Sequence, residues 1–168
     1  MSPAAIIQNI PVKTKFGIFW LQFSEKGLCS VLFPGASRLR IPGLRACLSL
    51  PRPGVRGVLK KFKDYFYSSG ESFRELGIDL SACTVFQRRV FSALRKVPAG
   101  DTVTYGELAI RAGYPGASRA VGSAMKMNRL PVVIPCHRVL PASGGLGEYS
   151  AGKQWKELLL AHEGVKTR

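Results

Sequence analysis

The sequence predicts an α/β protein in two parts, a small sheet with one helix in residues 1–80 and a mostly helical domain in residues 81–168. Near the N-terminus, two apolar runs separated by a short polar turn predict paired strands. After residue 80, apolar residues recur at helical spacing, and two helix starts carry a capping-box pattern. The sparse apolar residues of 71–82 place the boundary near residue 80.

The first part begins with a predicted β-hairpin. Its apolar runs, 16–23 and 28–33, flank Ser24-Glu25-Lys26-Gly27, a turn-like tetrapeptide that ends in glycine. Residues 34–54 are rich in Pro, Gly and Arg without a clear period, which indicates mostly loop. From Val55 onward, apolar side chains recur at helical spacing with lysines on the other faces, so an amphipathic helix follows.

The second part opens with three predicted helices. Thr84 with Gln87, and Thr104 with Glu107, match the capping box that starts a helix. The third helix, at about 117–127, is rich in small residues and follows the second after a break that contains glycine and proline. Two short helices joined by such a turn are the outline of a helix-turn-helix, and an ordinary helical hairpin has the same outline.

The charge of the chain indicates a polyanionic partner. Lys and Arg number 25 against 10 Asp and Glu, giving a formal net charge of +15. Charge alone fits nucleic acid, an acidic membrane surface or merely a very soluble surface. Because the third helix also carries Arg119 and Lys126 within a helix-turn-helix outline, DNA is the favoured polyanion.

Composition excludes several other classes. No apolar run is long enough to span a bilayer and no secretory leader is evident, so we expect a soluble, cytoplasmic protein. Residues 1–80 contain no histidine, which argues against a metal site there. The four cysteines have no close paired spacing, which argues against a zinc ribbon or a disulfide framework: Cys29, Cys47, Cys83 and Cys136.

The chemistry is expected at Cys136, which follows a buried apolar run and precedes His137. A thiol is nucleophilic as thiolate, so it needs a base or a positive environment, and His137 could supply the base. Neighbours on one strand point to opposite faces, so the pair needs a bend after Pro135. Glu163 is the best carboxylate to orient the histidine, with Glu148 and Glu157 as alternatives. A buried cysteine that acts only as a small apolar residue is the simpler interpretation.

Ile134-Pro135-Cys136-His137-Arg138-Val139 resembles the active-site signature of the 6-O-methylguanine-DNA methyltransferase family. The resemblance extends to Arg119-Ala120-Val121-Gly122, Asn128, Tyr149-Ser150 and residues 159–164, and so covers residues 80–164. Residues 1–79 match only in general layout. The chain departs from the usual family pattern at three positions, Ser118, Arg129 and Ala151, where alanine, proline and glycine are common.

The resemblance implies repair of DNA by direct damage reversal. Cys136 would take the alkyl group from 6-O-alkylguanine irreversibly, so the chain would act once, as a suicide methyltransferase without a cofactor. His137 would act as a base through a water, and Glu163 would orient it. The resemblance leaves open whether bulky alkyl groups and 4-O-methylthymine are accepted. Ala151 could narrow or stiffen the loop over the pocket, which bears on the bulky groups.

The resemblance also implies which residues would hold the guanine. Tyr105 would donate to its N3 edge, the backbone of Ser150 would serve the 6-oxygen, and the carbonyl of Val139 would accept from the exocyclic amine. Tyr149 and Met125 would wall the pocket. Asn128 would join the recognition helix to the active-site segment through its side chain, or would simply cap the helix.

The implied partner is double-stranded DNA with the alkylated guanine flipped out of the stack, bound by a monomer. Arg119 would fill the vacated place in the stack. The third helix would enter the minor groove, which is only about 6 Å wide. The small residues of this helix would let its backbone approach the narrow groove closely. The remaining residues implied in this contact are Ala120, Gly122, Ser123 and Lys126.

Two other functions fit the same residues. A helix-turn-helix protein that binds DNA or lesions without chemistry would keep its full function after loss of the Cys136 thiol. A cysteine hydrolase using Cys136 and His137 would turn over repeatedly on a small ester or amide. A limit of one event per chain would separate alkyl transfer from hydrolysis.

Overall fold

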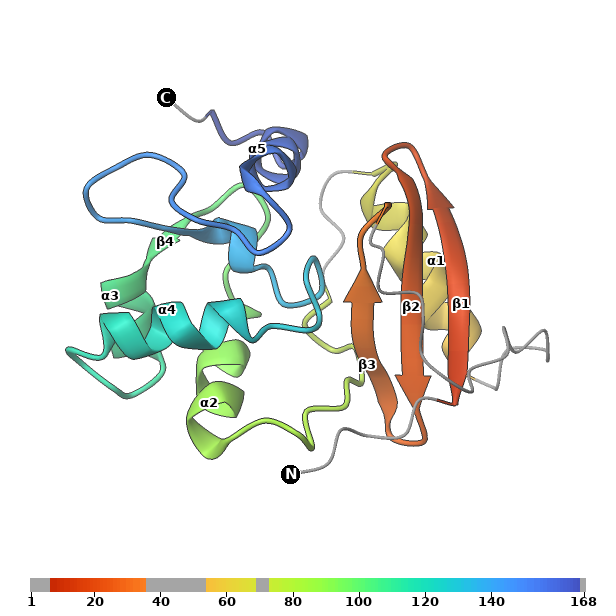
Figure 1. Ribbon diagram of the computed structural model, residues 1–168, viewed down its shortest axis with the longest axis horizontal. Coiled ribbons are helices and arrows are strands. Elements are labelled where there is room, and N and C mark those ends of the chain that lie inside the picture. The colour runs from red at the N-terminus through yellow and green to blue at the C-terminus, as the bar shows by residue number, and fades with distance from the viewer. Residues whose placement is uncertain (1–6, 36–53, 69–72, 167–168) are drawn as a thin grey trace. The chain divides into compact units, whose positions relative to one another are not determined.

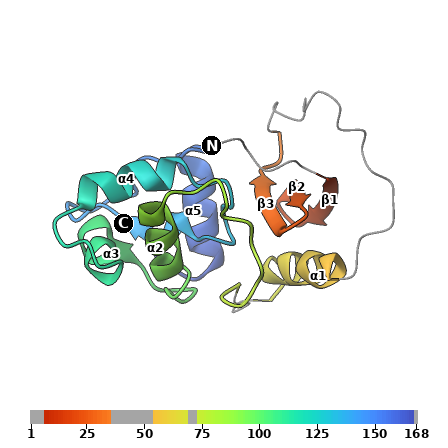
Figure 2. The ribbon, with the colours of Figure 1, turned by 90° about the horizontal axis from the view of Figure 1, so that it is seen from below.

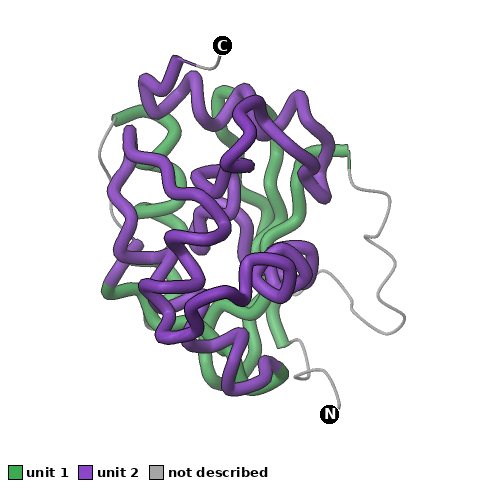
Figure 3. Tube along the Cα trace, turned by 90° about the vertical axis from the view of Figure 1, so that its left-hand side faces the viewer, with its two compact units in different colours: residues 1–71, 75–82 green, residues 72–74, 83–168 purple. Residues whose placement is uncertain are grey.

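The computed structural model describes residues 7–35, 54–68 and 73–166. The chain divides into two compact units, residues 1–71 with 75–82, and residues 72–74 with 83–168 (Figure 3). Most of the predicted loop at 34–54 lies outside the described residues. In the described part of the chain, no helix is long and apolar enough to cross a membrane.

Unit 1 is built on a three-stranded antiparallel sheet in the order β1 (Gln8–Thr14), β2 (Gly17–Ser24) and β3 (Gly27–Leu32) (Figure 1). The predicted hairpin is confirmed as β2 and β3. The prediction missed β1, whose Pro11 and polar residues weaken the apolar alternation. Proline is tolerated there because β1 is an edge strand.

Helix α1 (Val55–Tyr65) covers one face of this sheet, as Figure 2 shows, and it confirms the predicted amphipathic helix. Phe19 of β2 is fully buried and lies 5.5 Å from Phe62 and 5.0 Å from Phe66, measured between ring centroids. Aromatic pairs at this separation add to the stability that burial gives. The core of unit 1 is therefore an aromatic cluster between sheet and helix.

The described residues of unit 2 form four α-helices: α2 (Val85–Leu94), α3 (Tyr105–Arg111), α4 (Ser118–Lys126) and α5 (Lys153–His162). Both predicted capping boxes are present at the starts of α2 and α3. Helices α3 and α4 form the predicted helix-turn-helix pair, so the predicted α/β fold with a helical second part is confirmed. Helix α5 ends at His162, and Glu163 is its C-cap residue.

A short parallel pair, β4 (Val103–Thr104) and β5 (Val139–Leu140), was not predicted. Strands of two residues leave no periodic signal in a sequence. The pairing nonetheless fixes important geometry, because β4 leads directly into Tyr105 at the start of α3, and β5 follows the Cys136 segment. Tyr105 is thereby held in the same part of unit 2 as the candidate nucleophile.

The Cys136 segment forms a 3-10 turn, η2 (Cys136–Arg138), between α4 and β5. Every residue from 130 to 139 is buried. Val132 has a φ of 73°, a conformation that β-branched residues rarely adopt, so the surrounding contacts must hold it. The turn supplies the bend that the sequence required between Cys136 and His137.

Candidate active site

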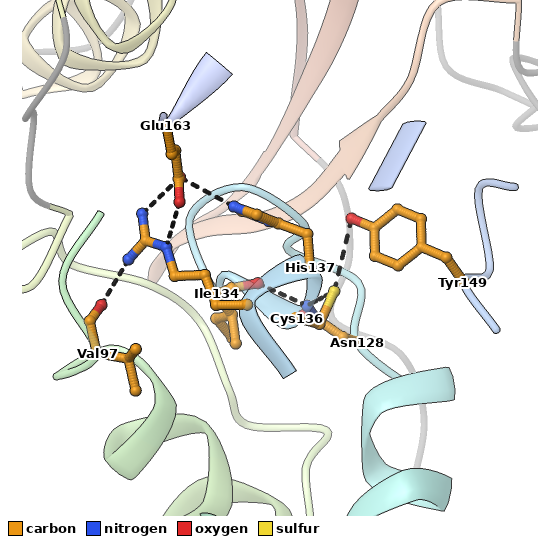
Figure 4. Close-up of polar contacts among 8 residues, drawn as sticks. Val97, Asn128, Ile134, Cys136, His137, Tyr149 and Glu163 are labelled. Atoms are coloured by element: carbon orange, nitrogen blue, oxygen red, sulfur yellow. Dashed lines mark hydrogen bonds and ion pairs between the residues drawn. The ribbon is translucent and has the colours of Figure 1, made fainter. Parts of the chain in front are cut away.

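The Cys136 sulfur is held between two polar side chains (Figure 4). Asn128 lies just beyond α4, and its Nδ2 donates to the sulfur over 3.1 Å. The thiol in turn donates to the hydroxyl oxygen of Tyr149 over 3.7 Å. Asn128 also donates to the Ile134 carbonyl and accepts from the Leu130 amide, both at 2.9 Å. Asn128 therefore ties the end of the helix-turn-helix to the nucleophile.

Cys136 is only 6% exposed. Burial raises the pKa of its thiol, while the hydrogen bonds with Asn128 and Tyr149 and the charge of Lys156 act in the opposite direction. The thiol is thus neutral at rest, and ionisation requires a group that accepts its proton. The neighbouring polar groups would then stabilise the thiolate.

His137 and Glu163 form a buried pair, with 2.9 Å between Nε2 and Oε1. Burial would raise the pKa of Glu163, but hydrogen bonds from His137 and Arg138 outweigh it and hold that pKa well below its usual range. An ionised carboxylate only accepts, so Nε2 carries the proton and Nδ1 is the acceptor. Nδ1 is buried and has no hydrogen-bond partner among the described residues.

Burial also lowers the pKa of His137, against the opposing effect of Glu163, so the imidazole is neutral at pH 7. A neutral ring with an acceptor nitrogen can take a proton. The two alternative carboxylates do not lie in this network, since Glu148 pairs with Lys153 at the surface and Glu157 is exposed.

Arg138 holds the carboxylate of Glu163 in position beside His137. Its Nε and Nη2 donate to the two carboxylate oxygens of Glu163 at 2.9 and 2.7 Å, and Nη1 donates to the carbonyl of Val97 (Figure 4). The side chain is 7% exposed. Bidentate pairing of this kind fixes a carboxylate in position and keeps it ionised. Sequence reasoning missed this role, although a charged residue inside a buried apolar run was a usable signal.

Lys156 of α5 is fully buried and donates to the Val139 carbonyl over 2.7 Å. Burial lowers the pKa of Lys156 to about 8, against the opposing effect of Cys136. The lysine therefore positions Val139, which was predicted to bind guanine, and adds positive charge to the thiol site. Sequence reasoning missed it because a lysine on a helix normally points to solvent.

An open groove of about 460 Å³ lies beside the helix-turn-helix. Tyr105, Arg119 and Gly122 line it, and a Cβ on Gly122 would meet the Tyr105 ring at 3.9 Å. Burial and the nearby Cys136 both raise the pKa of Tyr105, so its hydroxyl stays protonated and can donate. Sequence reasoning missed the rest of the lining: Thr104, Gly106, Ser118, Pro141 and Ala142.

The other predicted site residues divide by exposure. Met125 is buried at the end of α4, beside the active-site segment in sequence. Ser150 is exposed next to Tyr149. The solvent face of α4 carries Ala120, Ser123 and Lys126 together with Arg119.

Comparison with known proteins identifies the family. A family model described as the DNA-binding domain of 6-O-methylguanine DNA methyltransferase matches residues 85–165. The human methylated-DNA–protein-cysteine methyltransferase is 36% identical over 169 residues, which cover 94% of this chain and 81% of the human protein. The chain belongs to the 6-O-methylguanine-DNA methyltransferase family.

Other members of the methyltransferase family agree. The methylated-DNA–protein-cysteine methyltransferase of Salmonella typhimurium is 44% identical over 117 residues, covering 70% of this chain and 67% of the relative. The structure of Mycobacterium tuberculosis OGT in complex with DNA matches with a TM-score of 0.74 at 33% identity, covering 94% of this chain and 93% of that one. The methyltransferase of Pyrococcus kodakaraensis has a TM-score of 0.68 at 27% identity, covering 94% and 99%. The family likeness therefore includes both units.

Proposed function

We propose that this protein repairs DNA by direct reversal, moving the methyl group from the 6-oxygen of guanine in duplex DNA onto its own Cys136. The observation that carries the proposal is the buried network in which Asn128 contacts the thiol and Glu163 orients His137. Relatives named methylated-DNA–protein-cysteine methyltransferase support the same reaction.

His137 activates the nucleophile. Its Nδ1 is a buried acceptor, and the proton of the Cys136 thiol passes to it through a water. Glu163 and Arg138 stabilise the imidazolium that results, because the carboxylate stays ionised beside it. The charge of Lys156 and the amide of Asn128 stabilise the thiolate.

The thiolate then displaces the guanine. A bond forms between Sγ and the methyl carbon, the bond between that carbon and the 6-oxygen breaks, and its electron pair stays with the base. The guanine anion takes up a proton from solvent, and the imidazolium of His137 gives its proton back to solvent, so the base is left intact in the DNA. The thioether keeps its methyl group because a thiolate is a poor leaving group, so each chain acts once.

Recognition of the base uses groups around the groove and the thiol. Tyr105 donates from its protonated hydroxyl to the N3 edge, and the Ser150 backbone serves the 6-oxygen. A carbonyl oxygen has two lone pairs, and Lys156 donates to one of those on the Val139 carbonyl. The other accepts from the exocyclic amine of guanine. Tyr149 and Met125 close the walls of the pocket.

Access to the methyl carbon requires that the nucleotide flip out of the duplex, which costs a few kcal/mol. Arg119 fills the vacated place, while α4 lies in the minor groove through Ala120, Gly122, Ser123 and Lys126. The net charge of +15 favours this polyanionic partner. Because the substrate is cellular DNA, a cytoplasmic location is part of the proposal.

The deciding experiment is the mass of the Cys136 peptide after incubation with duplex DNA that carries one 6-O-methylguanine, with Cys136→Ser as control. We expect a gain of one methyl group in the wild type and none in the control, with at most one event per chain. An unmodified peptide with tight lesion binding would instead establish a lesion-binding protein without chemistry. Repeated turnover of a small ester would establish a hydrolase.

A further inference from the structure

The start of α2 presents two cations that the proposed reaction does not use, Arg88 and Arg89. Both side chains are exposed, and neither forms an ion pair with a described residue. Exposed arginines on a helix are often only a solvated face. Arg88 and Arg89 differ from such solvated arginines because each guanidinium is held in place by a contact with another residue.

Arg88 Nη1 donates to the carbonyl of Cys83 over 2.6 Å. The guanidinium of Arg89 lies 5.7 Å from the ring centroid of Tyr114, and that ring packs against Phe86 at 4.9 Å. Cation–π contact holds a guanidinium without neutralising it. Both cations are therefore positioned while their charge stays available to an anion outside the protein.

The Tyr114 contact places Arg89 beside the start of α4. Tyr114 lies in the turn of the helix-turn-helix, where its amide donates to the Ala109 carbonyl over 2.9 Å. Its own carbonyl accepts from the amide of Ala117 at 3.2 Å, and Ala117 is the N-cap residue of α4. A short chain of contacts thus joins Arg89 to the helix that carries Arg119.

The dimensions of DNA indicate what meets this surface. A helix with its side chains is about 10–12 Å across, whereas the minor groove is about 6 Å wide. A helix inserted there cannot be enclosed by the groove, so the elements that flank it meet the two phosphate backbones. Arginine suits that contact because its planar fork matches phosphate oxygens.

We infer that Arg89, together with Arg88, binds backbone phosphates beside the stretch of minor groove that α4 enters, forming a DNA contact outside the helix-turn-helix. The inference rests on the proposed function, since it requires α4 to dock on duplex DNA. Its effect is on affinity and its salt dependence, and not on the alkyl transfer itself, because neither arginine belongs to the thiol network.

The test compares Arg89→Gln and Arg89→Lys with a matched control, Lys96→Gln, which removes an exposed cation just beyond the opposite end of α2. Binding of a labelled, undamaged duplex is measured by fluorescence anisotropy across a salt series. The rate of methyl transfer from the nucleobase 6-O-methylguanine, without DNA, is measured in parallel. Circular dichroism confirms that each variant is folded.

We expect Arg89→Gln to make the plot of log affinity against log salt shallower by about 0.9, the loss of one phosphate contact. Arg89→Lys should keep most of the slope, Lys96→Gln should match the wild type, and all should react equally with the nucleobase. If Arg89→Gln and Lys96→Gln gave equal slopes and methyl transfer to Cys136 persisted, the inference would be overturned and the proposed function would stand. A wild type that neither binds duplex nor accepts methyl would instead refute the proposed function.

Discussion

The amide of Asn128 donates to the sulfur of Cys136 across 3.1 Å, so a residue just beyond α4, the helix proposed to contact DNA, touches the proposed nucleophile directly. Asn128 also bonds to the Leu130 amide and the Ile134 carbonyl, both within the buried 130–136 segment. One side chain therefore joins the end of α4 to the proposed nucleophile. This relationship gives the first prediction.

Asn128→Ala should destabilise the protein by about 2–4 kcal/mol, because it leaves the buried Leu130 amide without a partner and removes one of the two hydrogen bonds to the Ile134 carbonyl. Urea unfolding measures the change. The exposed neighbour Met127 is the control, and Met127→Ala should shift the free energy of unfolding by no more than about 0.5 kcal/mol. Equal losses in both variants would show that the Asn128 hydrogen bonds contribute nothing specific.

Glu163 should make stability sensitive to acid. Its pKa in the folded state is depressed below the ordinary 4.5, so its contribution is complete above that value and is lost as the pH falls toward the folded pKa. Glu163→Gln leaves Arg138 buried without a countercharge. The wild type should be much more stable than this variant at neutral pH, and the difference should shrink below pH 4.5.

Urea unfolding of both proteins across this acid range measures the difference at Glu163. Glu157→Gln, an exposed change on α5, is the control and should follow the wild type throughout. A constant difference between Glu163→Gln and the wild type at every pH would mean that Glu163 is not held ionised by its partners.

Lys156 should also make stability rise with pH, but in the alkaline range. Its folded pKa of about 8 lies below the ordinary 10.5, so between these values the folded state loses a proton that the unfolded chain keeps. This group therefore raises stability as the pH rises from 8 toward 10.5, and Lys156→Met should lack that rise. The comparison is made by urea unfolding, with the exposed Lys153→Met as control. Parallel curves for wild type and Lys156→Met would exclude a depressed pKa.

Arg119→Ala should slow methyl transfer from duplex DNA by about tenfold to a hundredfold, because part of the few kcal/mol needed to unstack the base is no longer recovered. Transfer from the nucleobase 6-O-methylguanine should keep its wild-type rate, since no base is flipped. Single-turnover assays on the two substrates give the ratio. An equal loss on both would place Arg119 in the chemistry and not in base flipping.

The sequence by itself determined the parts of the fold with strong local signals. Capping boxes at Thr84 and Thr104 and the periodic apolar residues of α1 are local features, and each predicted helix is present. The Pro135-Cys136-His137 motif likewise marked the family from residue identity alone. Capping hydrogen bonds and hydrophobic periodicity depend only on residues that are close in sequence, so they can be predicted without a structure.

Only the tertiary structure decided how distant residues meet. The two-residue strands β4 and β5 have no local signal, yet their pairing holds Tyr105 in place near Cys136. Sequence reasoning gave Arg138 and Lys156 no role, whereas in the folded chain both are buried and hold Glu163 and Val139 in position. Desolvation and hydrogen-bond geometry depend on what surrounds a group in space, so the ionisation of this site is a property of the folded chain.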